Sequence, residues 1–223
     1  MKNSLSKIEF WLFDLDNTIY QPNTKIFDQI DLRMKKYISK TLNISEDEAF
    51  KVQKEYYKKY GTTLFGLMKN NKVNADDFLN YVHNINLTNL EKSNELINLL
   101  ESLPGKKYIY TNGDKRHADN VLKKLEINNL FDGIFDIKKS GLVPKPEKKS
   151  LLNLLDLYGI DPRKTIFFED LEKNLMNASL MGMTTVLINY NKNSLKNSYV
   201  DYSFSTLIEA LKVIKSNLEE GIK

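Results

Sequence analysis

The chain has 223 residues, of which 41% are hydrophobic and 28% are charged, as expected of a folded globular protein. It contains no cysteine and only two histidines, which excludes disulfides, thiol nucleophiles, thiolate zinc sites and multi-histidine metal sites. The formal net charge of +4 gives little support to nucleic-acid binding. The chemistry of this chain must therefore depend on carboxylates, hydroxyls, amides and lysines.

The N-terminal segment lacks the long apolar run and the small-residue cleavage site of a secretory signal peptide. No stretch of the sequence approaches the roughly 20 apolar residues that a membrane-spanning helix needs. We therefore expect a cytoplasmic protein without a membrane partner.

The first predicted element is a short buried strand over residues 8–13, which ends in the acidic turn Asp14-Leu-Asp16-Asn17-Thr18. Apolar residues then recur at three- and four-residue steps over residues 26–42, which predicts a helix. A capping-box pattern, Ser45-Glu-Asp-Glu48, predicts a second helix over residues 45–57, and a third is predicted to begin at residue 74.

No strand pattern occurs between residues 24 and 88, so residues 21–87 are predicted to form a small all-helical cap inserted after the first strand. Beyond it, strands are predicted at residues 108–111, 131–137, 165–168, 184–188 and 202–204. Helices are predicted at residues 89–102, 116–125, 146–158, 172–181 and 205–218, with Pro146 at the first turn of its helix. This alternation predicts an α/β core of residues 1–20 and 88–223, a Rossmann-like parallel sheet with helices on both faces.

In an open parallel sheet, the binding crevice lies beyond the carboxyl ends of the strands. The residues that follow the predicted strands there are mainly acids, with a hydroxyl, an amide and a lysine. They are Asp14, Asp16, Thr111, Asn112, Lys145, Glu169 and Asp170. Each piece alone is more often a turn or a helix cap, but their joint occurrence at one edge of the sheet indicates a site.

This set of residues suits phosphoryl transfer assisted by a divalent ion. Clustered carboxylates repel one another unless a cation lies among them, and oxygen ligands favour Mg²⁺. One carboxylate can attack phosphorus as a covalent nucleophile, and a second acid two residues later can protonate the leaving oxygen and then activate water. A threonine hydroxyl and a lysine ammonium can hold the phosphoryl oxygens.

The four segments resemble the motifs of the haloacid dehalogenase superfamily of phosphohydrolases. The turn Asp14-Leu-Asp16-Asn17-Thr18 is similar to the DxDxT motif, and Thr111 to the Ser or Thr that follows a strand. Lys145 is similar to the third motif and the pair Glu169-Asp170 to the fourth. The resemblance covers nearly the whole chain, and it implies that the predicted helical insert is the cap of this superfamily.

The resemblance also implies roles for individual residues. Asp14 would be the nucleophile that forms an aspartyl-phosphate, and Asp16 the general acid and base. Mg²⁺ would be held by the carboxylates of Asp14 and Asp170 and by the backbone carbonyl of Asp16, while contact between Glu169 and the metal or its waters is left open. The substrate-binding residues would be Thr111, Asn112 and Lys145.

Three stretches resemble the pyrimidine 5′-nucleotidase branch of the superfamily, namely residues 14–20, 60–67 and 111–114. Members of this branch remove phosphate from nucleoside monophosphates such as UMP and CMP. Family dehalogenases lack the second acid of the first motif, so Asp16 favours a phosphate ester as substrate. The chain departs from the branch at Phe65, where a basic residue is common.

Other interpretations stay open. The same chemistry could act on phosphoglycolate or a sugar phosphate, and a phosphorylatable receiver-like signalling domain or a nucleic-acid-binding module would belong to different classes. We expect a monomer or a weak dimer. His117 could approach substrate, but a surface or capping position is expected for it, and His83, late in a cap helix, needs no function. Tyr56, Tyr57 and Tyr60 could offer a stacking face for a base, but they are expected to pack helix against helix.

Overall fold

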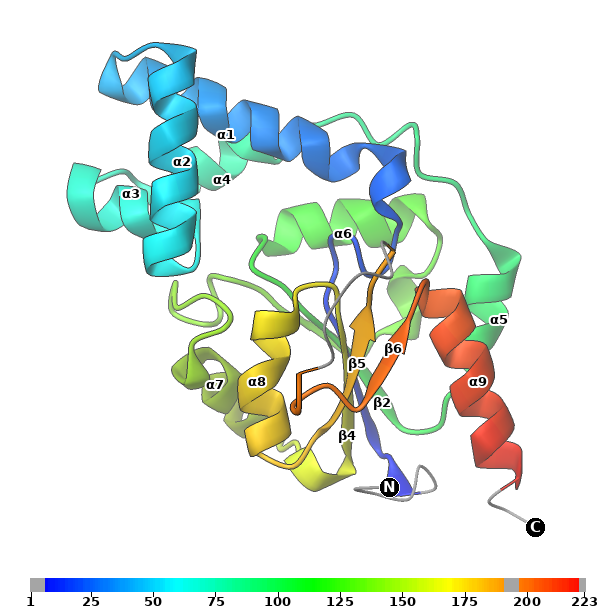
Figure 1. Cartoon of the computed structure of the whole chain (residues 1–223). Coiled ribbons are helices and arrows are strands. Elements are labelled where there is room, and N and C mark those ends of the chain that lie inside the picture. The colour runs from blue at the N-terminus through cyan, green and yellow to red at the C-terminus, as the bar shows by residue number, and fades with distance from the viewer. Residues whose placement is uncertain (1–6, 191–196, 221–223) are drawn as a thin grey trace.

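A computed structural model describes residues 7–190 and 197–220 of the chain (Figure 1). Its centre is a six-stranded sheet of order β3-β2-β1-β4-β5-β6, in which all neighbouring strands are parallel. The strands are β1 (Phe10–Phe13), β2 (Lys106–Tyr110), β3 (Gly133–Phe135), β4 (Thr165–Glu169), β5 (Thr184–Ile188) and β6 (Tyr202–Phe204). This doubly wound order confirms the predicted Rossmann-like α/β class.

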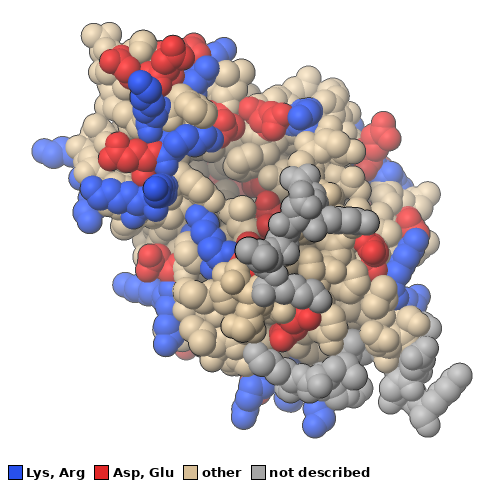
Figure 2. Space-filling view, in the orientation of Figure 1, with Lys and Arg blue, Asp and Glu red and all other residues tan. Residues whose placement is uncertain are grey.

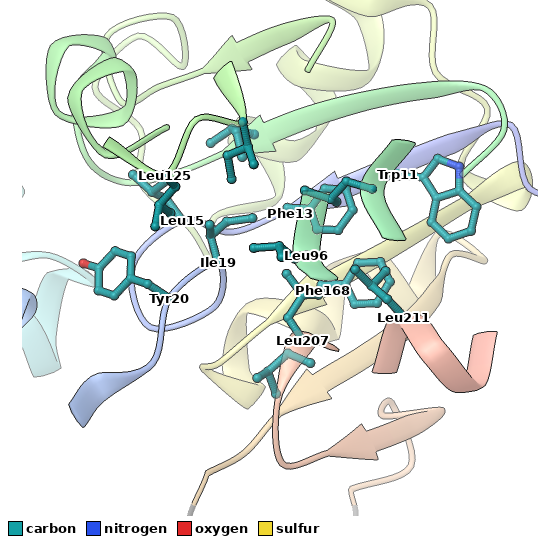
Figure 3. Close-up of a cluster of buried hydrophobic side chains, with 14 of the residues drawn as sticks. Trp11, Phe13, Leu15, Ile19, Tyr20, Leu96, Leu125, Phe168, Leu207 and Leu211 are labelled. Atoms are coloured by element: carbon teal, nitrogen blue, oxygen red, sulfur yellow. The ribbon is translucent and has the colours of Figure 1, made fainter. Parts of the chain in front are cut away.

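The central strands are buried on both faces, and successive side chains enter different cores. On β1, Trp11 and Phe13 lie in one apolar cluster and Leu12 lies in the other. Phe168 of β4 stacks on Phe13 with ring centroids 4.9 Å apart, and Figure 3 shows these rings beside Trp11. This packing fixes the two strands whose carboxyl ends carry most of the predicted acids.

Helices cover both faces of the sheet, as predicted (Figure 1). One face packs against α5 (Asn94–Ser102), α6 (Lys115–Lys124) and α9 (Leu207–Glu220), and the other against α7 (Lys148–Tyr158) and α8 (Glu172–Leu180). Short 3₁₀ turns occur at η2 (Pro22–Thr24), η3 (Asn128–Leu130) and η4 (Pro162–Lys164).

Two predicted helix starts are wrong. Pro146 does not open α7, because Glu147 is its N-cap and Lys148 its first residue. The helix predicted from residue 89 begins only at Asn94, where the Ser93 side chain accepts a hydrogen bond from the backbone amide of Leu96. A capping side chain therefore sets this boundary.

Between β1 and α5 the chain forms four α-helices, α1 (Ile26–Leu42), α2 (Glu46–Tyr60), α3 (Thr63–Asn71) and α4 (Ala75–Val82). The predicted capping box at Ser45 is present, and Asn74 caps α4. These helices share their own apolar cluster, and Figure 1 shows them above the carboxyl ends of the strands. The domain boundaries at residues 20/21 and 87/88 stay a prediction.

Helix α3 has no counterpart among the predicted elements. It contains Gly66, where a Cβ atom would lie 2.4 Å from the Cβ of Tyr56 on α2. A glycine at this point permits the close packing of α2 against α3, while it weakens the local helical signal. Among the described residues, no helix is both long and apolar enough to cross a membrane.

Candidate active site

The turn after β1 orients the first acidic residues. Asn17 adopts a left-handed conformation with φ of 61°, which asparagine tolerates better than most residues, and the backbone amides of Thr18 and Ile19 donate to the carbonyl of Leu15. The Thr18 hydroxyl donates to Oδ2 of Asp14 over 3.1 Å. The carboxylate of Asp14 is thereby held at the end of the central strand.

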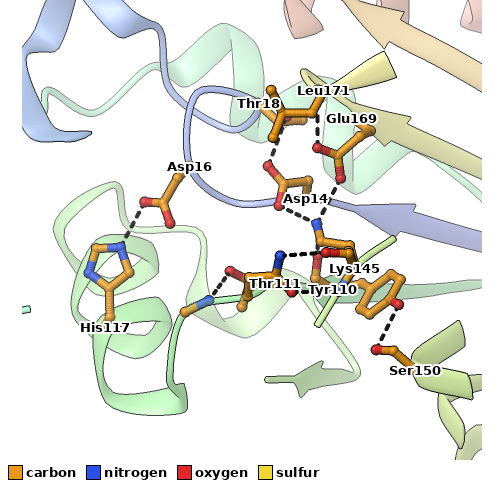
Figure 4. A network of polar contacts seen from close by, with 12 residues as sticks. Asp14, Asp16, Thr18, Tyr110, Thr111, His117, Lys145, Ser150, Glu169 and Leu171 are labelled. Carbon is orange, nitrogen blue, oxygen red and sulfur yellow. Dashed lines mark hydrogen bonds and ion pairs between the residues drawn. The ribbon is translucent and has the colours of Figure 1, made fainter. Parts of the chain in front are cut away.

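A buried lysine connects three strands of the sheet (Figure 4). The Nζ atom of Lys145, a residue that is only 2% exposed, donates to Oδ1 of Asp14 over 2.5 Å and to Oε2 of Glu169 over 2.7 Å. Its third bond goes to the backbone carbonyl of Tyr110 over 2.8 Å. Although burial alone would lower the pKa of Lys145, the two carboxylates raise it. All three ammonium protons are engaged, so Lys145 can act on an anion through its charge.

The segment that carries Lys145 is fastened to the end of β2 by Asn112. The backbone amide of Lys145 donates to Oδ1 of Asn112 over 2.8 Å, and Nδ2 of Asn112 donates to the Lys145 carbonyl over 3.2 Å. The neighbouring Thr111 hydroxyl accepts from the backbone amide of Gly113 over 2.9 Å, which leaves its proton to donate elsewhere. The contacts of Asn112 thus position Lys145, and substrate binding by Asn112 stays a prediction.

Three carboxylates crowd around the end of β4. Asp14, Glu169 and Asp170 each offer an oxygen within 4.8 Å of the others. Burial and the charge of Glu169 raise the pKa of Asp14 to about 7, despite the opposing effect of Lys145. Burial and the charges of Glu169 and Asp14 raise the pKa of Asp170 to about 10. A hard divalent cation favours the ionised forms of such oxygens, so this donor set fits Mg²⁺.

The second acid of the turn makes contacts that the sequence did not predict. Oδ1 of Asp16 accepts from the Tyr20 hydroxyl over 2.5 Å and lies 2.7 Å from Nε2 of His117. Burial would raise the pKa of Asp16, but His117 lowers it. Burial would conversely lower the pKa of His117, but Asp16 raises it. The expectation of a surface position is therefore wrong for His117, which is 1% exposed, whereas its backbone amide does bond the N-cap side chain of α6.

A cavity of about 360 Å³ lies between α1–α4 and the strand ends. Figure 2 shows the surface hollowed beside these helices, with acidic side chains near the hollow. The seven residues predicted at the strand ends all line this cavity, namely Asp14, Asp16, Thr111, Asn112, Lys145, Glu169 and Asp170. The structure thus brings the predicted site residues together.

The side of the cavity formed by α1–α4 is largely apolar, with Phe27, Leu64 and Phe78 among its lining residues. Gln53 also lines it, and the Oε1 atom of this buried residue has no hydrogen-bond partner within the described part of the chain. Tyr57 reaches the cavity as well, and Lys173 of α8 lies over its ring at 3.9 Å. The signal for Gln53 in the sequence was weak, because a glutamine on a helix is usually exposed.

Comparison with known proteins agrees with this site. The chain is 30% identical over 195 residues to "Phosphate metabolism protein 8" of Saccharomyces cerevisiae, covering 79% of this chain and 60% of the yeast protein. It therefore spans less than two thirds of that relative. It is 28% identical over 223 residues to "Glyceraldehyde 3-phosphate phosphatase" of Methanocaldococcus jannaschii, covering 92% of this chain and 96% of the archaeal protein.

Solved structures share the fold. A HAD phosphatase from Thermococcus onnurineus superposes with a TM-score of 0.65 at 24% identity, covering 93% of this chain and 98% of that one. Residues 11–178 match the family described as haloacid dehalogenase-like hydrolase, a range that runs from β1 to α8 and contains every predicted site residue. On this match, the chain belongs to the haloacid dehalogenase-like hydrolase family.

Proposed function

We propose that the protein is a Mg²⁺-dependent phosphomonoesterase that acts through an aspartyl-phosphate on Asp14, with nucleoside 5′-monophosphates, especially pyrimidine nucleotides, as substrates. The observation that supports this most is the position of the Asp14 carboxylate. It lies at the end of β1 beside the Lys145 ammonium, faces the cavity and has a second acid, Asp16, two residues later. The names of the two curated relatives agree with phosphate chemistry.

The reaction would have two steps. A carboxylate oxygen of Asp14 attacks phosphorus, the ester P–O bond breaks with its electron pair on the leaving oxygen, and Asp16 gives that oxygen a proton. Water then attacks phosphorus, gives a proton to Asp16, and the bond to Asp14 breaks to release phosphate. The charge of Lys145 and the hydroxyl of Thr111 would stabilise the phosphoryl oxygens in both steps.

Mg²⁺ would be held by the carboxylates of Asp14 and Asp170 and by the backbone carbonyl of Asp16. When bound, it would neutralise phosphoryl charge and polarise a phosphoryl oxygen. Both oxygens of Glu169 are already engaged, since Oε2 accepts from Lys145 and Oε1 accepts from the backbone amide of Leu171 over 3.2 Å. We assign Glu169 to holding Lys145 in place. Each carboxylate oxygen keeps a second lone pair, as those of Asp14 do beside Lys145 and Thr18, so contact of Glu169 with the metal or its waters is left open.

The cavity favours a leaving group with an apolar face. Its volume is within the range of small-molecule sites, about 300–1,000 Å³. A nucleobase could pack on the apolar cap side, and the Gln53 amide could turn its unpartnered, buried Oε1 toward a base N–H. A small phosphorylated aldehyde or sugar is the second candidate, because the archaeal relative is named for such a substrate. The cavity under the cap and the presence of Asp16 favour turnover over a receiver-like phosphorylated state.

A hydrolysis panel tests this proposal. We expect kcat/KM to be highest for UMP and CMP, lower for AMP, and lowest for glyceraldehyde 3-phosphate, phosphoglycolate and glucose 6-phosphate. Removal of Mg²⁺ with EDTA should lower each rate by at least about 10²-fold, because a catalytic metal supplies several kcal/mol of transition-state stabilisation. Phosphate release measured with and without Mg²⁺ gives both results. A preference for the small phosphates would replace the nucleotide assignment and leave the phosphatase chemistry in place.

Replacing Gln53 with methionine tests the base contact. The variant keeps a side chain of similar length but loses the amide, and we expect kcat/KM for UMP to fall by about 10-fold, the value of one hydrogen bond. Activity toward p-nitrophenyl phosphate, which lacks the base, should stay unchanged. Gln29→Met is the matched control, because Gln29 bonds the backbone of Asn86 outside the cavity lining. Equal losses on both substrates would argue against base recognition by Gln53.

A further inference from the structure

Both histidines of the chain, His83 and His117, lie near Asp16, the proposed general acid and base, and Figure 4 labels His117. His117 is in the first turn of α6, and its Nε2 lies 2.7 Å from Oδ1 of Asp16. A carboxylate oxygen accepts hydrogen bonds, so Nε2 is the donor in this contact. The Tyr20 hydroxyl donates to the same oxygen over 2.5 Å. Oδ1 of Asp16 therefore has two donors, and Oδ2 is the oxygen left for a substrate.

His117 is held by two further contacts, one at its backbone and one at its ring. Its backbone amide donates to Oδ1 of Asp114, the N-cap residue of α6, over 2.9 Å. Its ring stacks on the ring of His83 with centroids 4.4 Å apart and an interplanar angle of 11°. His83 follows α4 of the cap, and its Nδ1 lies 3.0 Å from the same Asp114 oxygen. A cap residue and a core helix thus hold the imidazole together.

We propose that His117 is a positioning residue for Asp16, an inference that rests on the proposed function. By binding Oδ1, it turns Oδ2 of Asp16 toward the cavity, where that oxygen takes up a proton in the substrate complex and passes it to the leaving group. The ring of His83, which Asp114 holds through Nδ1, stacks on the imidazole and fixes its plane, so correct alignment of Asp16 depends on the cap lying against α6. A purely structural role would require only that the buried ring fill its space.

A positioning role and a purely structural role of His117 predict different effects of the leaving group on kcat/KM. A p-nitrophenolate leaves phosphorus without a proton, whereas the alkoxide of benzyl alcohol needs one as it departs. The kcat/KM value reports the steps up to the first P–O cleavage, in which Asp16 acts as an acid. Loss of alignment should therefore lower kcat/KM for benzyl phosphate and spare p-nitrophenyl phosphate. Both substrates carry one aromatic ring of similar size, which makes them a matched pair.

The experiment compares His117→Phe, which keeps a stacking ring and loses the donor, with His117→Gln, which keeps a donor and loses the ring. We expect His117→Phe to lower kcat/KM for benzyl phosphate by about 10²-fold and that for p-nitrophenyl phosphate by no more than about threefold, within the usual range of general acid catalysis. His117→Gln should recover most of the benzyl phosphate activity. If His117→Phe does not fold, His117→Asn, whose amide is too short to reach Oδ1, carries the same expectation.

The outcomes separate the inference from the function on which it rests. Equal losses on the two substrates, or no loss on either, would overturn the positioning role of His117 while wild-type turnover leaves the phosphatase assignment in place. Failure of the wild-type protein to hydrolyse either ester with Mg²⁺ present would overturn the proposed function itself. Recovery by His117→Gln without a leaving-group difference would also count against positioning.

Discussion

Asp14→Asn is expected to lower kcat for phosphate-ester hydrolysis by at least about 10⁴-fold, because an amide oxygen is a far weaker nucleophile than a carboxylate. Asparagine has nearly the same shape, and its amide can accept from Lys145 and donate to the Thr18 hydroxyl. The substitution also neutralises one of three crowded carboxylates. We therefore expect Tm to stay within about 4 °C of the wild-type value, equivalent to about 1 kcal/mol in a chain of this size.

The measurement is hydrolysis of p-nitrophenyl phosphate with Mg²⁺, together with thermal unfolding followed by circular dichroism. Asp119→Asn is the matched control, because it removes a carboxylate that pairs only with Lys115 among the described residues, on an exposed face of α6. This control should keep wild-type activity. Near-normal hydrolysis by Asp14→Asn would contradict a covalent mechanism through Asp14.

Much of the fold is predictable from the sequence, and so are the site residues at the carboxyl ends of the strands, because both depend on local patterns. Short apolar runs that end in polar turns mark β1, β2 and β4, and the carboxyl ends of parallel strands meet at one edge. This geometric rule brings Asp14, Thr111 and Asp170 to one cavity without knowledge of any tertiary contact. The position of Lys145 follows less directly, since it depends on a loop that Asn112 fastens.

The contacts that refine the site are long-range, and local patterns do not contain them. Asp16 and His117 are separated by 101 positions, and their contact requires both the β1 turn and the start of α6. The available signal was Asp114 three residues before His117, a spacing typical of an N-cap. It places His117 in the first turn of a helix beside the site but does not say which way its ring points. The role of Glu169 as a partner of Lys145 is hidden for the same reason.

Lys145→Met is expected to affect both stability and activity, because it removes the cation between two buried carboxylates. Glu169 is 1% exposed, and both it and Asp14 would lose their shortest hydrogen bond. Removing one partner of a buried ion pair costs about 3–5 kcal/mol, so Tm should fall by roughly 6–20 °C. Loss of the positive charge near the phosphoryl group should lower kcat by about 10²–10³-fold.

A second variant separates these two effects. Adding Glu169→Gln to Lys145→Met removes one of the uncompensated charges, while the amide oxygen of glutamine can still accept from the backbone of Leu171. We expect the double variant to recover most of the lost Tm and none of the lost activity, with unfolding measured in EDTA and again with Mg²⁺. The proposed Mg²⁺ ligands are the same in both variants, but the uncompensated charge of Glu169 beside them attracts the cation only in Lys145→Met, so Mg²⁺ should raise the Tm of Lys145→Met more than that of the double variant. Recovery of activity would instead mean that Lys145 acts only by neutralising Glu169, and that the phosphoryl group does not depend on its charge.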